Sequence, residues 1–285
     1  MILETHLEKE PLVSVLMTAY NREKYIAAAI ESVLVSTYTN WELIIVDDRS
    51  KDKTVEIAKQ YEIKDSRIKI FINDKNLGDY PNRNKAASYA KGKYLKYIDA
   101  DDLIYPWGLE LLVKMMEQFP TSGWGLCSFP QVEKPYPFVL TPKEAYMYNY
   151  FESGIFHKAP LSAIIKRITF EEIGGFADIR MAGDFEMWHR LAQKYNVVLM
   201  PDGIVWYRKH GEQEIKHYRQ FIPVYEKIRI AYLVNDNCPI DKNVAKEILR
   251  TTKRKFAKEV FKGILKINKN IIIDNLKCLR EYKNV

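Results

Sequence analysis

The chain has 285 residues, 47% hydrophobic and 28% charged, which suits one large globular domain or a domain with an appendage. Its net charge of +7 is uneven, because residues 241–285 carry a local net charge of +8 and residues 1–240 sum to −1. This argues against a nucleic-acid groove across the protein and favours a basic terminal element that meets an anionic surface. The N-terminus does not resemble a signal peptide, no run of about 18 apolar residues occurs, and three scattered cysteines read as reduced thiols, so we expect a cytoplasmic protein without a membrane span.

Apolar runs alternate with helical patterns over the first hundred residues. Strands are predicted at 12–17, 41–46, 68–72 and 94–98, with helices that begin near Asn21, Ser50 and Lys85. The stretch 76–84 is predicted to be a loop, and Gly92 a helix C-cap. This alternation predicts an α/β fold with a mostly parallel sheet flanked by helices.

Beyond residue 120 the pattern is less regular. Further strands are expected at 164–165, 197–200 and 204–207, a helix at 185–195, and helices throughout 214–285.

The most informative motif is Asp99-Ala100-Asp101-Asp102, which follows the strand 94–98. Clustered carboxylates repel one another, and a divalent cation that bridges to substrate phosphates relieves this repulsion. The alternative is a solvated turn that caps a helix beginning near Leu103. Because parallel strands bring Tyr20, Asp48 and Asp99 to one edge of the sheet, the metal and phosphate interpretation is favoured.

An ordered set of motifs over residues 11–211 resembles glycosyltransferase family 2. The set comprises Val13-Ser14-Val15, Tyr20-Asn21, Leu43–Ser50, Asn76-Leu77-Gly78, Arg83-Asn84, Ala90–Tyr94, Asp99–Asp102, Ile173–Phe176, Gly183-Asp184, Trp188, Arg190 and Tyr207–His210.

The resemblance implies a Rossmann-like GT-A fold and an inverting enzyme that moves a sugar from a nucleotide-sugar to an acceptor hydroxyl with Mn²⁺ or Mg²⁺. We expect a catalytic domain at 1–211, with a nucleotide-binding half at about 11–120 and an acceptor half at about 121–211, followed by a basic helical extension at 212–285. We expect a UDP-sugar donor, and an acceptor that is a glycan or a lipid-linked glycan in surface polysaccharide synthesis.

Five residues are candidates for binding the donor. Tyr20 can stack on the base while the Thr18 backbone bonds the base edge; the alternative for Tyr20 is a core tyrosine. Asp48 can accept a hydrogen from a uracil imide, or can be a turn residue at the strand end. Asp99 suits ribose hydroxyls or the metal. Arg83 can face the diphosphate or form a surface salt bridge.

Two residues are candidate metal ligands. Asp101 is the candidate direct ligand. His210 follows a predicted strand, and in some family members a histidine here touches the metal or the diphosphate; the alternative is a structural role. Asp102 can serve the metal shell or cap the next helix, and we favour the cap.

The resemblance makes Asp184 the general base that accepts the proton of the acceptor hydroxyl. The alternative is a helix N-cap. Many family members carry a second acidic residue where this chain has Gly183, and Glu186 is the weaker candidate for the base. His157 and His189 are interpreted as structural or surface residues.

The C-terminal segment predicts an amphipathic helix with Phe256, Val260, Ile264, Ile267 and Ile271 on one face. Its lysines lie largely away from that face. The helix either packs on the catalytic domain or rests on the inner face of an anionic membrane.

Two alternatives to a glycosyltransferase remain. One is a non-catalytic relative that binds nucleotide-sugars, and the other is a sugar nucleotidyltransferase, although Thr18–Asn21 lacks the glycine-rich phosphate loop that such an enzyme would need.

Overall fold

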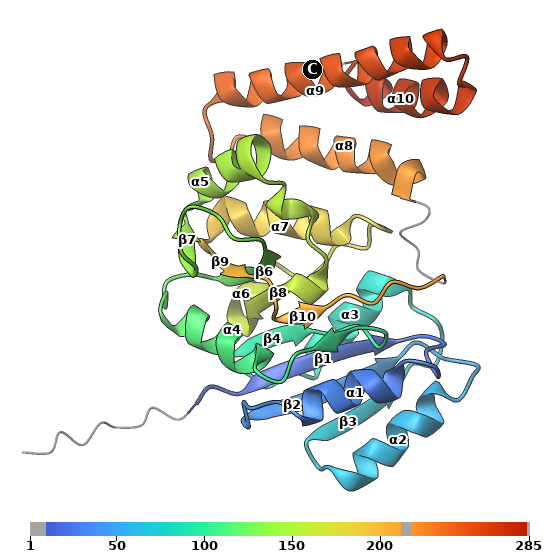
Figure 1. The fold of residues 1–285 in the computed structure, drawn as a ribbon, viewed down its shortest axis with the longest axis vertical. Coiled ribbons are helices and arrows are strands. Elements are labelled where there is room, and N and C mark those ends of the chain that lie inside the picture. The colour runs from blue at the N-terminus through green and yellow to red at the C-terminus, as the bar shows by residue number, and fades with distance from the viewer. Residues whose placement is uncertain (1–9, 212–217, 284–285) are drawn as a thin grey trace, which may run out of the picture. The chain divides into compact units, whose positions relative to one another are not determined.

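The computed structural model describes residues 10–211 and 218–283 (Figure 1). The chain forms two compact units. The first comprises 10–139, Lys158–Asp178 and Asn196–Arg208, and the second comprises Leu140–His157, Ile179–Tyr195, 209–211 and 218–283. A division of the chain at residue 211 stays a prediction.

Within the described residues, eight strands form one sheet in the order β3-β2-β1-β4-β8-β6-β9-β7, and β5 pairs with β10 in a second sheet. The strands are β1 (Val13–Ala19), β2 (Trp41–Asp47), β3 (Ile68–Ile72), β4 (Tyr94–Tyr97), β5 (Leu103–Ile104), β6 (Trp124–Phe129), β7 (Phe138–Leu140), β8 (Ala163–Lys166), β9 (Val197–Pro201) and β10 (Val205–Trp206).

The pairs β3/β2, β2/β1, β1/β4 and β6/β9 are parallel, whereas β8 runs antiparallel to both of its neighbours. The expected mostly parallel α/β fold is therefore confirmed. Val13 pairs with Trp41 on one side and with Tyr94 on the other, so β1, β2 and β4 run in step. Their carboxyl ends lie next to one another at one edge of the sheet, which positions the candidate site.

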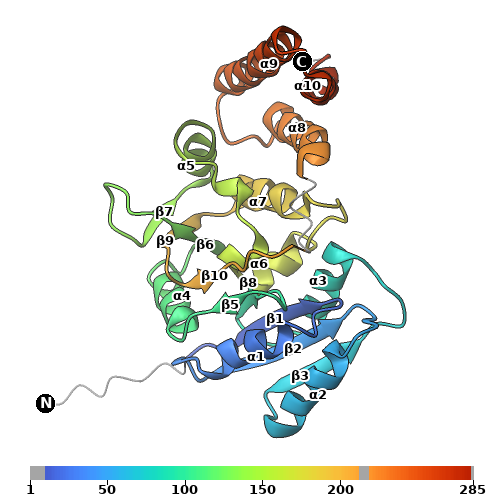
Figure 2. The same ribbon diagram turned by 45° about the vertical axis from the view of Figure 1, so that its right-hand side comes forward.

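Helices cover the sheet because its strands are apolar on both faces. The helices of the first unit are α1 (Ile26–Leu34), α2 (Thr54–Lys64), α3 (Asp79–Ser88), α4 (Gly108–Glu117) and α6 (Arg167–Glu172), with a short helix η3 (Pro160–Ser162). The residues Val13, Val15 and Met17 of β1 share one core with Ile26 and Ile30 of α1. The helix α3 contacts β1 and β2, and Figures 1 and 2 show α1 and α2 along strands β1 to β3.

Three local predictions in this unit were wrong. The helix expected near Leu103 begins instead at Gly108, because Pro106 disfavours a helical conformation at Tyr105. The expected loop 76–84 already becomes helical at Asp79, since Pro81 is tolerated in a first turn. Because α3 ends at Ser88, Gly92 is not its C-cap.

The second unit is helical. It contains α5 (Pro142–Met147), η1 (Tyr148–Glu152), η2 (Ile155–His157), α7 (Gly183–Lys194), α8 (Tyr218–Val234), α9 (Lys242–Leu265) and α10 (Lys269–Glu281). The helices α8, α9 and α10 pack against one another, and Figures 1 and 2 show α9 and α10 side by side. Among the described residues, no helix has both the length and the apolar character needed to cross a membrane.

The expected continuous apolar face at the C-terminus was also wrong. The helix α9 ends at Leu265, and Ile267 takes a positive φ of 52° before α10 begins. Phe256 and Ile271 are half-buried, whereas Ile264 and Ile267 are exposed. The five apolar residues therefore lie on two helices and a turn, with different surroundings.

Candidate functional site

The candidate site begins at the carboxyl ends of β1, β2 and β4 in the first unit. Tyr20, Asp48 and Asp99 each follow one of these strands closely. The backbone reinforces the arrangement, since the Asp48 N–H donates to the Ala19 carbonyl (2.8 Å) and the Ala100 N–H donates to the Thr18 carbonyl (3.3 Å). Parallel sheets place ligands at such an edge.

Asp48 shapes the loop that follows β3. Its carboxylate, 3% exposed, accepts hydrogen bonds from the Leu77 N–H (2.7 Å), the Gly78 N–H (2.9 Å) and the Asn73 side chain (2.9 Å). Gly78 has a φ of 88°, a conformation that favours glycine. Asp48 thus makes the turn contacts of the alternative interpretation, while its bond to a base stays a prediction.

Arg83 is a buried cation held between two carboxylates. Its Nη2 donates to Asp99 Oδ2 at 2.9 Å, its Nη1 lies 2.7 Å from Asp99 Oδ1, and its Nε donates to Asp79 Oδ1 at 2.8 Å. Burial acts to lower its pKa, but Asp79 and Asp99 outweigh that effect and raise the pKa of Arg83 well above its usual value. The Arg83 side chain is only 7% exposed, whereas those of Asp99 and Asp79 are 26% and 48% exposed, so the cation is buried and its two partners reach solvent.

Asp101 pairs with an arginine that sequence reasoning missed. Arg22 Nε donates to Asp101 Oδ2 at 2.8 Å, and Arg22 Nη1 donates to the carbonyl of Tyr20 at 3.1 Å. Asp101 is largely buried. Arg22 therefore links the end of β1 to the acidic motif. The two residues are 79 positions apart in sequence, so no local sequence pattern predicts their contact.

Asp102 does not cap a helix. Its Oδ1 accepts the backbone N–H of Arg208 at 2.8 Å, and the Arg208 Nε donates to the Asp101 carbonyl, also at 2.8 Å. Burial and the nearby Asp99 raise the pKa of Asp102 well above its usual range. The prediction of a cap was wrong because the chain continues from Asp102 into β5 and not into a helix.

At the end of β1, Tyr20 is exposed and Thr18 is half-buried. The Tyr20 side chain is 42% exposed, so the alternative of a core tyrosine is wrong, and its ring is available for stacking. The Thr18 hydroxyl donates to Asp99 Oδ1 at 3.3 Å. Thr18 thus joins Arg83 in orienting the Asp99 carboxylate.

The oxygen-rich character of this edge fits a hard divalent cation. Mg²⁺ and Mn²⁺ bind carboxylate oxygens, and Mg²⁺ commonly takes one or two of these together with substrate phosphates. Within the described ranges, no group of three or more His, Cys, Asp or Glu side chains is arranged to hold a metal. The role of Asp101 as a direct metal ligand stays a prediction.

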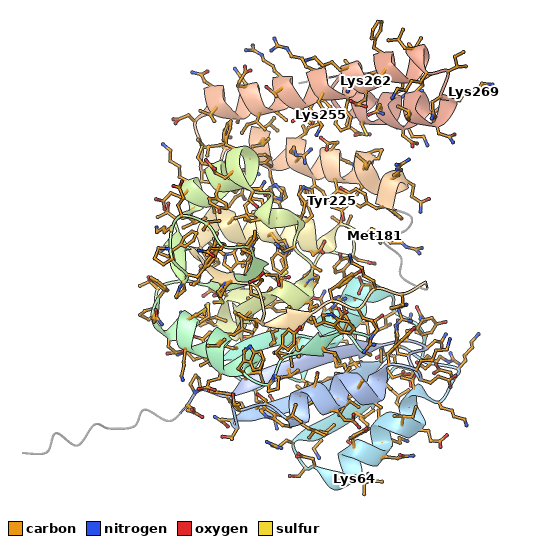
Figure 3. The ribbon with its side chains drawn as sticks, viewed as in Figure 1. Lys64, Met181, Tyr225, Lys255, Lys262 and Lys269 are labelled. Carbon is orange, nitrogen blue, oxygen red and sulfur yellow. The ribbon has the colours of Figure 1, made fainter. Side chains whose placement is uncertain are left out.

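Asp184 lies in the second unit, at the second residue of α7. The residue at the N-cap position is Ala182, so the alternative of an N-cap role for Asp184 was wrong. Asp184 is half-buried. The pKa of Tyr225 is raised mainly by the burial of Tyr225 itself and further by the negative charge of Asp184. The Tyr225 hydroxyl, which sequence reasoning missed, donates to the Met181 carbonyl and ties α8 to the segment before α7 (Figure 3).

Glu186 and His189 have structural partners in the same unit. Glu186 pairs with Arg190 at 2.7 Å and accepts from the Tyr232 hydroxyl. His189 is fully buried, with Nδ1 2.8 Å from the Phe185 carbonyl and Nε2 2.8 Å from the Tyr150 hydroxyl, and burial lowers its pKa to about 3. The His157 residue is solvent-exposed, although its ring packs on the rings of Phe185 and Tyr225, and this partial desolvation lowers its pKa to about 4. These surroundings agree with the interpretation of the two histidines as structural or surface residues.

His210 is half-buried and follows Arg208 by two residues. It belongs to the second unit, whereas Asp101 belongs to the first. Its role as a metal or diphosphate ligand stays a prediction.

The fold has the architecture of the GT-A glycosyltransferases. It is similar to a solved structure of S. aureus TarS in complex with UDP-GlcNAc, with a TM-score of 0.69 at 19% identity, over 93% of this chain and 79% of that one. It is also similar to the mannosyltransferase PcManGT from Pyrobaculum calidifontis in complex with GDP-Man and Mn²⁺, with a TM-score of 0.62 at 16% identity, over 96% and 87% of the two chains.

The family model described as glycosyl transferase family 2 matches residues 14–174. An uncharacterized glycosyltransferase of Methanocaldococcus jannaschii is 33% identical over 216 residues, which cover 70% of this chain and 71% of that protein. The UDP-Glc:alpha-D-GlcNAc-diphosphoundecaprenol beta-1,3-glucosyltransferase WfgD of Escherichia coli is 44% identical over 105 residues, 37% of this chain and 41% of that protein. The chain belongs to glycosyltransferase family 2 and is an enzyme that transfers glycosyl groups.

Proposed function

We propose that this enzyme is an inverting, metal-dependent glycosyltransferase that uses a nucleotide-sugar, with UDP as the nucleotide, and extends a cytoplasmic glycan or lipid-linked glycan for a surface polysaccharide. The observation that carries the proposal is made at the carboxyl ends of β1, β2 and β4, which we call the strand-end edge. There, buried Arg83 holds Asp99, the first residue of the motif that also contains Asp101. The ligands named for the solved relatives support the donor class, since they are UDP-GlcNAc, UDP and GDP-Man.

The donor would lie along the strand-end edge. Tyr20 would stack on the base beside the Thr18 backbone, Asp48 would accept the imide hydrogen, and Asp99 would accept ribose hydroxyls. Arg83 supports this arrangement, because it holds Asp99 in a fixed orientation, and it would itself face the diphosphate.

Asp101 and His210 would hold the divalent cation, Mn²⁺ or Mg²⁺, which when bound neutralises charge on the leaving diphosphate. Asp184 would accept the proton of the acceptor hydroxyl as its oxygen attacks the anomeric carbon. The bond from that carbon to the diphosphate oxygen breaks on the opposite face, so the configuration inverts and the nucleoside diphosphate leaves.

The printed name of WfgD contains a lipid diphosphate acceptor, which supports an acceptor of that class for this chain. Such an acceptor lies in a membrane, and the basic C-terminal helices are the part of the chain suited to meet it.

Calorimetric titration of UDP, GDP, dTDP and CDP, each with Mn²⁺ and with EDTA, tests the proposal. We expect UDP to bind in a metal-dependent manner. Asp101→Ala should remove the metal dependence, whereas Asp184→Asn should keep binding and lower transfer about 10²–10⁴-fold.

Glu186→Gln is the matched control for the base, because it changes a neighbouring carboxylate that is already paired with Arg190. It should retain transfer. Binding of no nucleotide would overturn the donor site, and near-normal transfer by Asp184→Asn would remove that residue from the base role.

A further inference from the structure

The helices α9 and α10 form a closely packed hairpin. At the crossing, a Cβ on Gly263 would approach Ile272 Cγ1 to 2.9 Å and Ile271 Cγ2 to 3.1 Å, so a side chain there would push the helices apart. At the other end of the hairpin, Tyr282 is fully buried and donates its hydroxyl hydrogen to Glu226 of α8. The hairpin is therefore anchored at its base, and its turn is held in a defined shape.

The turn end of this hairpin exposes large apolar side chains. We call Phe261, Ile264, Leu265 and Ile267 the hairpin tip; their exposed fractions are 62%, 55%, 68% and 86%. Large exposed apolar groups that are close in sequence and rimmed by polar residues mark interaction surfaces. The packing of α8, α9 and α10 leaves these four side chains exposed, so it does not account for apolar residues at these positions.

Ile267 has a backbone conformation that isoleucine disfavours. Its φ of 52° lies in the left-handed region, which disfavours a β-branched residue, and turns after helices prefer glycine or asparagine there. An isoleucine at this position is unfavourable for the backbone and contributes little packing. Its presence is best explained by a contact outside the folded chain.

Exposed lysines surround the hairpin tip. They are Lys255, Lys258, Lys262, Lys266 and Lys269, three of which are labelled in Figure 3. Lys258 and Phe261, and likewise Lys262 and Leu265, are three residues apart on α9 and are neighbours on its surface. Between residues 255 and 269 the only acidic residue is Glu259, which pairs with Lys262 at 2.6 Å.

We propose that the hairpin tip inserts into the surface of an anionic phospholipid bilayer. The apolar side chains would enter the boundary between headgroups and acyl chains, while the lysine stems extend along them and carry the ammonium groups to the lipid phosphates. A second copy of the chain is a poorer occupant, because it would bring two sets of lysines together. This inference deepens the membrane contact in the proposed function, because it names the residues of the C-terminal helices that would enter the bilayer.

Flotation of the full chain with lipid vesicles tests this surface without donor or acceptor, so its result is independent of the proposed reaction. We expect binding to vesicles of phosphatidylcholine with phosphatidylglycerol, weakened by salt, and little binding to phosphatidylcholine alone. The double variant Leu265→Asn/Ile267→Asn should lower the partition coefficient about tenfold or more. Lys262→Gln/Lys269→Gln should lower it about tenfold on anionic vesicles.

Two residues of α2 provide matched controls. Ile63 is 85% exposed, close to the 86% of Ile267, and Ile63→Asn should leave vesicle binding unchanged. Lys64→Gln should likewise have little effect (Figure 3). Thermal melts confirm that the variants are folded.

Three results would overturn the proposal. They are absence of wild-type binding to anionic vesicles, equal binding by the double tip variant, and equal loss in the Ile63→Asn control. Conversion of a dimer to a monomer by the tip variants would also reject it, since a second copy of the chain would then cover the tip.

Discussion

The strand-end edge and the hairpin tip both concentrate charge, but they hold it in opposite ways. At the edge, Asp99 is paired with Arg83, Asp101 with Arg22, and Asp102 with the Arg208 backbone, and these carboxylates are largely buried or held by buried partners. At the tip, the lysines point into solvent beside exposed apolar groups. The carboxylates at the edge need partners within the protein because they are partly buried. The lysines at the tip are solvated, so they need no internal partner and can pair with an external anion.

The largest expected effect at the edge comes from removing its buried cation. Arg83→Met leaves the Asp99 and Asp79 carboxylates without their guanidinium, and it should lower the free energy of unfolding by about 2–4 kcal/mol. It should also weaken nucleotide binding, because Asp99 loses the partner that orients it. Urea unfolding and calorimetry measure the two effects.

Lys114→Gln is the control, since Lys114 forms an exposed pair with Glu110 at 2.5 Å and should matter little to stability. An Arg83→Met variant as stable as wild type would mean that the edge does not depend on internal pairing.

A buried lysine near the edge should give the enzyme a pH-dependent stability that exposed tip lysines do not explain. Lys96 is fully buried, donates to the carbonyls of Leu161 and Ala163, and burial lowers its pKa from 10.5 to about 8. Between these values the unfolded chain binds more protons, so the free energy of unfolding rises with pH.

Relative to Lys96→Met, the wild type should therefore gain roughly 1–3 kcal/mol of stability as the pH rises through that interval. Below about pH 7 both states hold the proton, and the difference between the two proteins should stay constant. Denaturation at a series of pH values measures this, and a pH-independent difference throughout would contradict it.

The smallest expected effect is at the tip, and it has the opposite sign. Ile267→Asn replaces a β-branched residue in the left-handed region with one that tolerates it, so stability should rise by about 0.5–1 kcal/mol. Ile267→Val, which keeps the branch, should bring no such gain. A loss of stability in the asparagine variant would show that Ile267 packs within the fold after all.

Strands β1 to β4, β8 and β9 were predictable because they are short, apolar and bounded by polar turns, whereas β6 and β7 of the same sheet were not predicted. The predicted strand 68–72 coincides with β3, and the residues expected at one edge lie at adjacent strand ends. The partners of those residues were not predictable, because Arg22 and Arg208 reach Asp101 across 79 and 107 positions. Arg83 and Arg208 lie within motifs recognised in the sequence, but only Arg83 of the three arginines was assigned a role at this site in advance.

Errors in helix boundaries had local steric causes. Pro106 delays α4, and the left-handed turn at Ile267 divides what apolar spacing alone joins into one helix. The spacing of apolar residues predicts which of them share a helical face, but it does not predict a single residue, such as Ile267, at which the chain reverses direction. The exposure of the tip became visible only once that reversal was known.

Gly263 shows how a missing side chain can act as a mechanical setting. Its hydrogen lets α10 cross α9 with Ile271 and Ile272 seated directly on the backbone. A methyl group added at this position would force α9 and α10 apart at their crossing and change the angle between them. The size of the residue at this one interior position therefore sets the spacing of α9 and α10, while the surface residues stay the same.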